Sequence, residues 1–208
     1  MQIFRPFSPS IGKFKIPNDV INDINIHVNE TIKDSNLTKK LDHGKNLAGE
    51  VTQEFKLTKE FLKKGLLNIF ANATKDYIFN SDEFNTNKKE ITKFELIESW
   101  VVRHFEYEYN PTHWHGGHIS GVAYLQLPDS FGPSKKNDNR NGYIEFIHGT
   151  RQFLNNSTIS FKPKIGDLYI FPHYLMHTVF PFFGKGERRS VSFNAYIDQN
   201  IFNVHGKN

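Results

Sequence analysis

Three histidines in the second half of the chain have the spacing of a metal site. His113 and His115 are separated by one residue in the run His-Trp-His-Gly-Gly-His. On an extended strand, residues i and i+2 point to the same side, so both imidazoles would face one point. Two converging neutral imidazoles make half of a site for a first-row transition metal. His177, at the start of a later predicted strand, completes a candidate triad.

The last predicted strand, 190–197, supplies a candidate anion anchor through its alternation. The polar parity consists of Arg188, Ser190, Ser192 and Asn194. The other parity consists of Arg189, Val191, Phe193 and Ala195. Because the apolar face can pack on helices, the polar face is expected to point inward, which favours Arg188 over Arg189. A planar guanidinium grips a carboxylate with two hydrogen bonds, and the Ser190 hydroxyl lies beside it.

Five motifs, in this order and spacing, resemble those of a known enzyme family. They are Ser-Trp-Val at 99–101, His-x-His at 113–115, Ser-Gly-Val-x-Tyr-Leu at 120–125, a Phe-Pro…His segment at 171–177 and Glu-Arg-x-Ser-x-Ser-Phe-Asn at 187–194. The stretches 99–127, 142–149 and 163–194 resemble the 2-oxoglutarate/Fe(II) oxygenases of bacteria and phages, within the prolyl-hydroxylase-like superfamily. The resemblance covers roughly the C-terminal half of the chain.

The resemblance implies a dioxygenase with Fe(II), 2-oxoglutarate and O2 as cofactor and co-substrates. It implies release of succinate and CO2 coupled to hydroxylation of a second substrate, with a slight preference for prolyl-hydroxylase chemistry on a protein. The Arg188 and Ser190 pair would hold the distal carboxylate of 2-oxoglutarate. Tyr124 shares strand parity with Ser120 and Val122, so its phenol either donates to that carboxylate or packs in the core; both interpretations stay open.

The second metal ligand has alternatives, because the family usually carries His-x-Asp/Glu and this chain has His115 in the acidic position. Glu145 is the alternative carboxylate, although its alternation with Ile144 and Phe146 turns it away from them. His118, three residues beyond His115, is a candidate for the mouth of the pocket. The expected ligands of the metal are His113, His115 and His177.

The elements that position these residues are helices first and short strands afterwards. We expect an edge strand at 11–16, a helix to about residue 33, a loop at 42–46, and a long amphipathic helix that begins after Thr58. Strands are expected at 94–109, where Asn110-Pro111 turns the chain, then at 113–127, 142–147, 158–162, 168–171 and 190–197. Loops 80–90 and 129–141 would frame the opening of the pocket.

This order predicts a mainly β protein with flanking helices. The resemblance implies a double-stranded β-helix, also called a jelly roll or cupin-like core. The 208 residues suit a single domain, 1–208, with a helical support region at 1–90 and the β core at 91–200.

Composition narrows the environment and the chemistry. The chain has no cysteine, so a metal would be held by histidine, carboxylate or water. It has no long apolar run, and we expect a cytoplasmic protein, of a cell or of an infected host, without membrane contact. A net charge of +4 is weak evidence for nucleic-acid binding, which stays an open alternative. The expected partner is a small-molecule or protein substrate, and the oligomeric state stays open.

Two rival functions remain at this stage. A cupin-type metalloenzyme would use His-x-His without any oxo acid and would have no use for Arg188. A non-catalytic ligand-binding barrel that has lost its metal would explain why no Asp or Glu follows His113.

Overall fold

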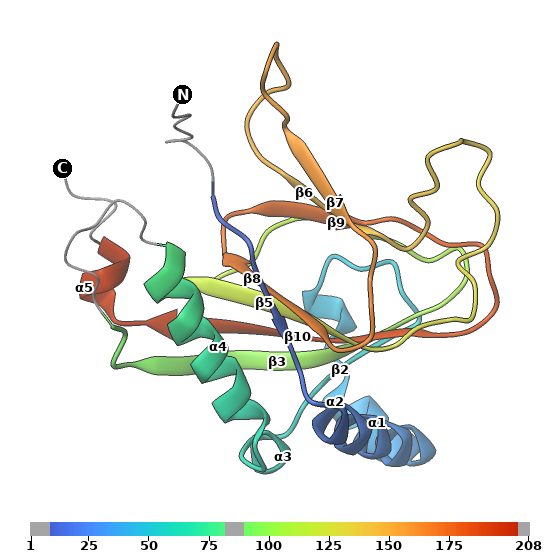
Figure 1. Cartoon of the computed structure of the whole chain (residues 1–208). Coiled ribbons are helices and arrows are strands. Elements are labelled where there is room, and N and C mark those ends of the chain that lie inside the picture. Colours follow the sequence, from blue (N-terminus) through green and yellow to red (C-terminus); the bar gives the residue numbers. More distant parts are fainter. Residues whose placement is uncertain (1–8, 82–89, 204–208) are drawn as a thin grey trace.

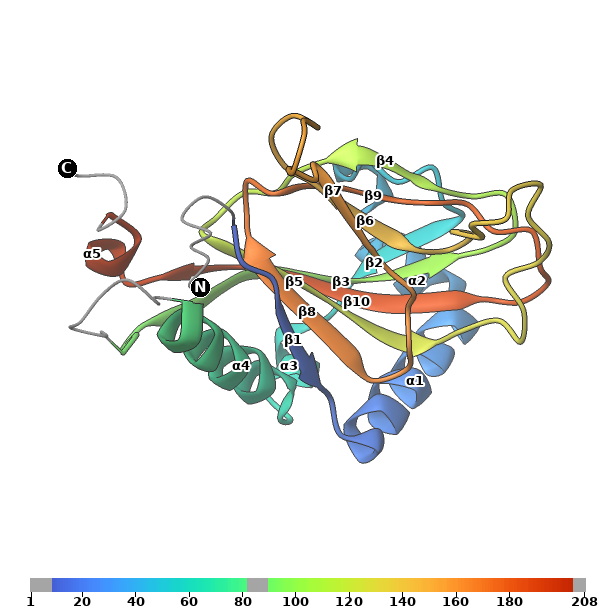
Figure 2. The same ribbon diagram turned by 45° about the horizontal axis from the view of Figure 1, so that its top comes forward.

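Two antiparallel sheets form the centre of the chain, whose computed structural model describes residues 9–81 and 90–203 (Figure 1). The strands are β1 (Gly12–Lys15), β2 (Gln53–Lys56), β3 (Phe94–His104), β4 (Asn110–His113), β5 (Ile119–Gln126), β6 (Ile144–Ile147), β7 (Thr158–Phe161), β8 (Asp167–Pro172), β9 (Met176–Val179) and β10 (Arg188–Ile197). The larger sheet has the order β1-β8-β5-β10-β3-β2, and the smaller has β4-β9-β6-β7. The smaller sheet lies over the larger one (Figure 2), and the expected double-stranded β-helix core is confirmed.

Helices cover the outer face of the larger sheet, opposite the smaller sheet (Figures 1 and 2). They are α1 (Asn18–Lys33), α3 (Lys59–Leu62) and α4 (Leu66–Ser81), and α2 (Ser35–Leu41) follows α1. The short α5 (Gln199–Phe202) lies beyond the end of β10 (Figure 1), and a 3-10 turn at Gly44–Asn46 lies beside the space between the sheets. The apolar stripes of α1 and α4 meet the sheet in one core, where Ile24, Val28 and Phe70 are fully buried. None of the described helices has the length and apolarity needed to cross a membrane.

The central strand β10 separates this helical core from the space between the sheets. It pairs with β3 on one side and β5 on the other. Val191, Phe193 and Ala195 belong to the helical core, whereas Arg188 and Ser190 face the space between the sheets. The observed alternation of β10 is therefore the one expected from the sequence.

The sequence pattern predicts that Phe94, Leu96, Trp100 and Val102 share one face of β3. This prediction is wrong, because the strand contains a β-bulge. In the register with β10, Leu96 pairs with Ala195 while Glu98 pairs with Asn194. One extra residue, Ile97, thus lies between two consecutive partners. The bulge turns Leu96 towards the helices and Trp100 towards the space between the sheets.

The expected turn at Asn110-Pro111 is also wrong. β3 ends at His104, the chain turns over 105–109 with Tyr107 at φ 70°, and Asn110 then begins β4. Pro111 is accommodated because β4 is an edge strand, where a missing N–H breaks no ladder bond.

Two expectations in the N-terminal half need correction. Only a loop at 42–46 was expected in the polar region 34–54, but this region also contains α2 and the start of β2. The Asp34 side chain caps α2 by accepting from the backbone of Asn36 and Leu37. Thr58 caps only the short α3, because the chain breaks at Gly65, which has φ +134°. Most of the expected loop 80–90 lies outside the described residues.

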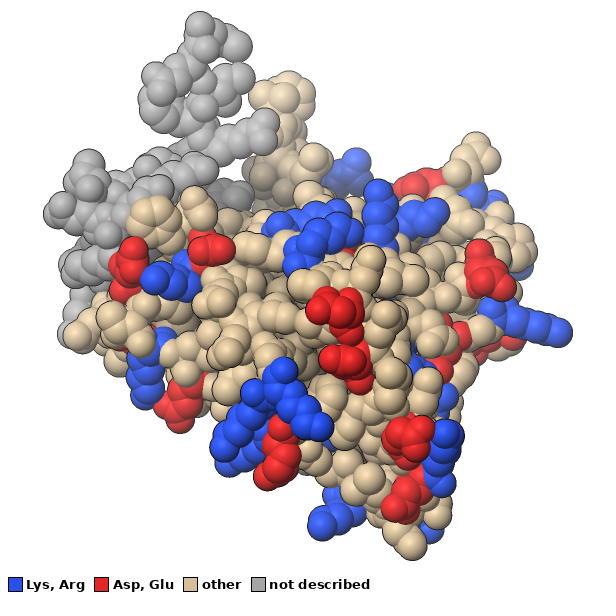
Figure 3. Space-filling model, turned by 60° about the horizontal axis from the view of Figure 1, so that its bottom comes forward, with Lys and Arg blue, Asp and Glu red and all other residues tan. Residues whose placement is uncertain are grey.

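Charged side chains of both signs alternate over the face that lies at the bottom of Figure 1, as Figure 3 shows. On this face the excess of basic residues does not gather into one patch. The face therefore gives no support to nucleic-acid binding there.

Candidate functional site

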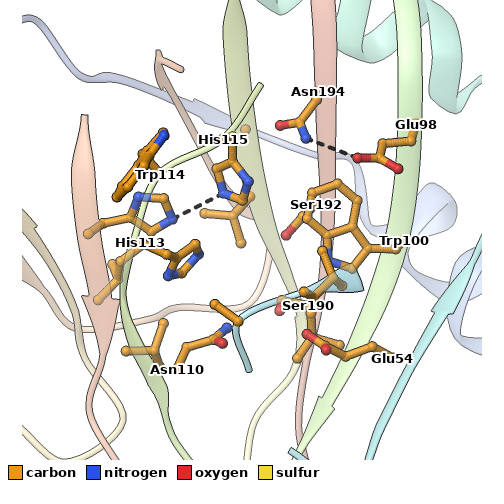
Figure 4. A pocket seen from close by; sticks show the side chains of 18 of the residues that line it. Glu54, Glu98, Trp100, Asn110, His113, Trp114, His115, Ser190, Ser192 and Asn194 are labelled. Carbon is orange, nitrogen blue, oxygen red and sulfur yellow. Dashed lines mark hydrogen bonds between the residues drawn. The ribbon is translucent and has the colours of Figure 1, made fainter. Parts of the chain in front are cut away.

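A cavity of about 270 Å³ opens between the two sheets and contains the candidate residues. Its walls come from β2, β3 and β10 of the larger sheet and from β4 and β9 of the smaller sheet, together with the segment after the 3-10 turn. Figure 4 shows His113 and His115 on one side of this cavity and Glu54, Glu98 and Trp100 on the other.

The three expected histidines lie together in the cavity. β4 pairs with β9 so that His113 is opposite His177, and His115 follows in the β4–β5 loop. One ring nitrogen of each lies within 4.8 Å of the others, and the Nε2 atoms of His115 and His177 are 3.3 Å apart. The cluster has the donor spacing of a metal site, and it contains no carboxylate.

Hydrogen bonds to the backbone orient two of these rings. His113 Nδ1 lies 2.7 Å from the carbonyl of Pro111, and His177 Nδ1 lies 3.0 Å from that of Leu175. Because a carbonyl only accepts, Nδ1 carries the proton and Nε2 keeps its lone pair for the cluster. Burial, followed by the neighbouring imidazoles of His113 and His173, lowers the pKa of His115 to about 3. The three neutral imidazoles therefore fit a divalent transition metal.

His115 reaches the cluster for a different reason than strand alternation, because it lies beyond the end of β4. Its backbone N–H donates to the carbonyl of His173 at 3.0 Å, and His173 Nδ1 donates to the carbonyl of His115 at 3.1 Å. Gly117, at φ +90°, then returns the chain to β5, where a Cβ would approach the Ala195 carbonyl to 3.0 Å. His173, which the sequence did not single out, thus positions His115.

His118 lies outside the lining of the cavity. Its Nδ1 accepts from the backbone N–H of Ile197 at 3.1 Å, and its ring stacks on Phe202 at 3.8 Å. These contacts tie α5 to the sheet, so the expectation that His118 lines the pocket mouth is wrong.

Glu145 is engaged elsewhere. Its Oε2 accepts from Arg140 Nη1 at 2.8 Å and from Ser160 Oγ at 2.7 Å, and it is not part of the histidine cluster. The strand alternation that turned Glu145 away from Ile144 agrees with this position.

We therefore expect Glu145→Gln to change the affinity for Fe(II) by less than about 3-fold, since no charged ligand is removed from the metal. Equilibrium dialysis of Fe(II) without oxygen measures this, with His113→Ala as the variant that must lose binding. A loss of an order of magnitude or more in Glu145→Gln would make Glu145 a ligand.

Arg188 lies at the inner end of the cavity and is only 2% exposed. Its guanidinium carbon sits 4.9 Å from the ring centroid of Tyr124. Neither Arg188 Nε nor the Tyr124 hydroxyl has a hydrogen-bond partner among the described residues. No described carboxylate forms an ion pair with Arg188, although arginine keeps its charge even when burial lowers its pKa. A buried cation without a counterion is costly, so this position is built to receive an anion.

Arg189 has the opposite surroundings. It donates to both carboxylate oxygens of Glu187, at 2.7 and 3.0 Å, and to Asn25 Oδ1 at 3.0 Å. Glu187 also accepts from Arg103 at 3.0 and 3.1 Å. This buried network joins α1 to the end of β10, so Arg189 is fully paired where Arg188 is not.

One cavity residue, Glu54, was not expected from the sequence, because no strand was predicted in the polar region 34–54. Glu54 is on β2, is 2% exposed, and its Oε2 has no hydrogen-bond partner among the described residues. Burial, followed by the carboxylates of Asp42 and Glu108, raises the pKa of Glu54 to about 8.

This shift predicts a pH dependence of stability. Between the unfolded pKa of Glu54, near 4.5, and its folded pKa near 8, the folded state holds a proton that the unfolded state releases. The free energy of unfolding therefore falls as the pH rises through this window. Urea unfolding at pH 5 and pH 8 should show that Glu54→Gln recovers about 2 kcal/mol of that loss. The exposed Glu50→Gln is the control, and equal slopes in both variants would contradict the expectation.

The fold and the site together define a class: a double-stranded β-helix protein with a three-histidine cluster and an unpaired arginine in one cavity. Residues 98–194 match the family model described as "Putative 2OG-Fe(II) oxygenase". The resemblance drawn from the sequence is thereby confirmed.

Solved structures give the same fold. A prolyl-4-hydroxylase of Pseudomonas putida has a TM-score of 0.55 at 12% identity, over 90% of this chain and 93% of that chain. A prolyl hydroxylase of Trichoplax adhaerens, in complex with a hypoxia inducible factor peptide, has a TM-score of 0.56 at 10% identity, over 95% and 87%. Iron-bound HygX of Streptomyces hygroscopicus has a TM-score of 0.55 at 10% identity, over 89% and 81%. No curated protein matches the chain.

Proposed function

We propose that the protein is an Fe(II)- and 2-oxoglutarate-dependent dioxygenase that hydroxylates a polar small molecule or a peptide. The observation that carries the proposal is that the histidine cluster and the unpaired Arg188 open into the same cavity. A metal site alone would not explain why a buried, unpaired arginine lines the same cavity. A dicarboxylate that reaches from the metal to Arg188 would use both.

In this proposal, His113, His115 and His177 hold Fe(II) through ring nitrogens that face the cluster. The Nδ1–H donations of His113 and His177 to carbonyls keep these rings in the ligating tautomer. When bound, Fe(II) and 2-oxoglutarate supply the activation of O2, with release of succinate and CO2.

The other end of the cavity would orient the co-substrate. Arg188 would donate hydrogen bonds to the distal carboxylate, and the Ser190 hydroxyl would contribute another. Tyr124 is buried against Arg188 with its hydroxyl unpaired, so the phenol is available to the same carboxylate. Burial raises the pKa of Tyr124 to about 12, which keeps this phenol protonated as a donor.

The missing carboxylate ligand also fits a dianionic co-substrate. Three neutral imidazoles leave the +2 charge of the metal uncompensated by protein. 2-Oxoglutarate would bring two negative charges, one to the metal and one to Arg188. Binding of the co-substrate would thus compensate the metal charge that three neutral histidines leave unbalanced.

The test is a succinate-release assay with and without Fe(II), run against fractions of cell extract as the source of substrate. We expect succinate to form only with Fe(II) and to rise with one or more fractions, and His177→Ala to form none. If the wild type binds iron but never binds 2-oxoglutarate, the protein is a cupin-type metalloprotein instead. If it binds neither, it is a non-catalytic barrel.

A further inference from the structure

The wall of the cavity away from the histidines is lined by hydrogen-bond acceptors. Glu54 and Glu98 line this wall, whereas Asn110 lines the cavity from β4, the strand that carries His113. Figure 4 shows Glu54 and Asn110 in the lower part of the cavity. Glu54 Oε2 and Asn110 Oδ1 are both buried without a hydrogen-bond partner among the described residues. Two acceptors without partners therefore line one cavity, from β2 and from β4.

The other oxygen of the Glu54 carboxyl group, Oε1, lies near Asn110 Oδ1, beside Gly49. A Cβ at Gly49 would lie 3.0 Å from Glu54 Oε1 and 2.7 Å from Asn110 Oδ1. The oxygens are thus close enough to serve one donor group, and no side chain at position 49 fills the space between them.

Glu98 differs, because the protein satisfies it. Its Oε1 accepts from Asn194 Nδ2 at 3.3 Å, and its Oε2 lies 3.0 Å from His43 Nε2 and 3.7 Å from Lys56 Nζ. No described Lys or Arg forms an ion pair with Glu54. Lys56 therefore pairs with Glu98, and Glu54 has no basic partner among the described residues.

Glu54 Oε2 has no hydrogen-bond partner among the described residues. A buried carboxylate without a partner costs several kcal/mol, and more beside other carboxylates. What would satisfy Glu54 is a donor, preferably a charged one, that enters from the cavity.

We propose that the substrate carries an organic cation, an alkylammonium or guanidinium group, which Glu54 and Asn110 bind. The inference rests on the proposed function, since it assigns the substrate class of that site. Binding of the cation would release the proton that buried Glu54 holds, so that Arg188 faces the anionic co-substrate and the Glu54 carboxylate faces the cationic substrate. The buried Trp100 lines the same wall and offers an aromatic face to such a cation.

Tryptophan fluorescence gives a direct test, because the chain has two tryptophans and both Trp100 and Trp114 line the cavity. The probes are L-arginine and L-lysine, each against a neutral counterpart, L-citrulline and N6-acetyl-L-lysine. Blocked tripeptides centred on arginine or citrulline distinguish a free substrate from a peptide. Titrations are run without oxygen, on protein loaded with Mn(II) and 2-oxoglutarate and on protein without either.

We expect at least one cationic probe to bind at least 10-fold more tightly than its neutral counterpart. Glu54→Gln, which keeps the shape of the side chain, should abolish that preference, and the exposed Glu50→Gln should keep it. Asn110→Asp should strengthen cation binding several-fold, a gain that misfolding would not produce. Equal binding of charged and neutral probes, or an unchanged preference in Glu54→Gln, would overturn the inference.

The two proposals fail separately. Arg188→Ala should lose 2-oxoglutarate but keep the preference for the cation in protein without Mn(II). If the preference is present and 2-oxoglutarate never binds, the proposed function is wrong and the cation site stands. If 2-oxoglutarate binds and no cationic probe is preferred, the cation site is wrong and the proposed function stands.

Discussion

Replacing Arg188 with alanine is expected to weaken 2-oxoglutarate binding by roughly 30-fold or more, because a buried charged hydrogen bond is worth about 2–5 kcal/mol. Arg188 has no ion-pair partner among the described residues, so the whole of its charge is available to the ligand. Arg188→Lys should recover only part of the affinity, since an ammonium cannot make the planar two-bond grip. The measurement is a calorimetric titration of 2-oxoglutarate into Mn(II)-loaded protein without oxygen.

Arg189→Ala is the matched control for this experiment. It removes the neighbouring guanidinium, which is bound to Glu187 and Asn25 rather than to the cavity. We expect 2-oxoglutarate affinity to stay within about 3-fold, while stability falls by roughly 3 kcal/mol, because Glu187 loses a buried partner. Loss of binding in Arg189→Ala with full binding in Arg188→Ala would contradict the assignment of the anchor.

Replacing His177 with alanine is expected to lower Fe(II) affinity by more than about 100-fold. Mutation of a residue that only hydrogen-bonds to a metal ligand already costs about 10–100-fold in metal affinity, and His177 is itself a proposed ligand. His177 supplies one of the three donor nitrogens of the cluster, and the cluster contains no carboxylate that could replace it. Elemental analysis after dialysis against Fe(II) measures the occupancy.

His118→Ala is the control for the metal site. His118 is also buried and also near the β4–β5 loop, but its Nδ1 is bound to the backbone of Ile197. It should keep full iron occupancy. Full occupancy in His177→Ala, or an equal loss in His118→Ala, would move the metal away from the proposed triad.

The orientation of the β10 side chains could be predicted from the sequence. Its period-two alternation separates Arg188 from Arg189 without any knowledge of the fold, because one parity is apolar and must pack on helices. The structure finds the two arginines in those two environments. Side-chain alternation depends only on neighbouring residues of one strand, so a single sequence is enough to predict it.

His115 marks the limit of that argument. Strand alternation would bring it beside His113, yet β4 ends before it and the pair of hydrogen bonds with His173 fixes its place. Those partners are 58 residues apart, and no local pattern predicts such a contact. The bulge at Ile97 could not be predicted for the same reason, because an extra residue is recognised only from the register with the paired strand.

Glu54 was missed for a related reason. On β2 it is followed by Phe55 and Lys56, and a four-residue strand is too short for its period to stand out from a polar segment. Its burial comes from pairing with β3, which is far along the chain. A buried, unpaired carboxylate was therefore recognisable only once that pairing was known.

The central claim is that the metal and Arg188 are two ends of one site bridged by 2-oxoglutarate, and metal affinity tests it most directly. Mn(II) affinity should be measured by equilibrium dialysis without oxygen, with and without 2-oxoglutarate, in the wild type and in Arg188→Ala. Because binding free energies are reciprocal, we predict at least about 10-fold tighter Mn(II) binding with 2-oxoglutarate in the wild type, and most of that gain lost in Arg188→Ala. Equal Mn(II) affinity in the wild type with and without 2-oxoglutarate would contradict the claim.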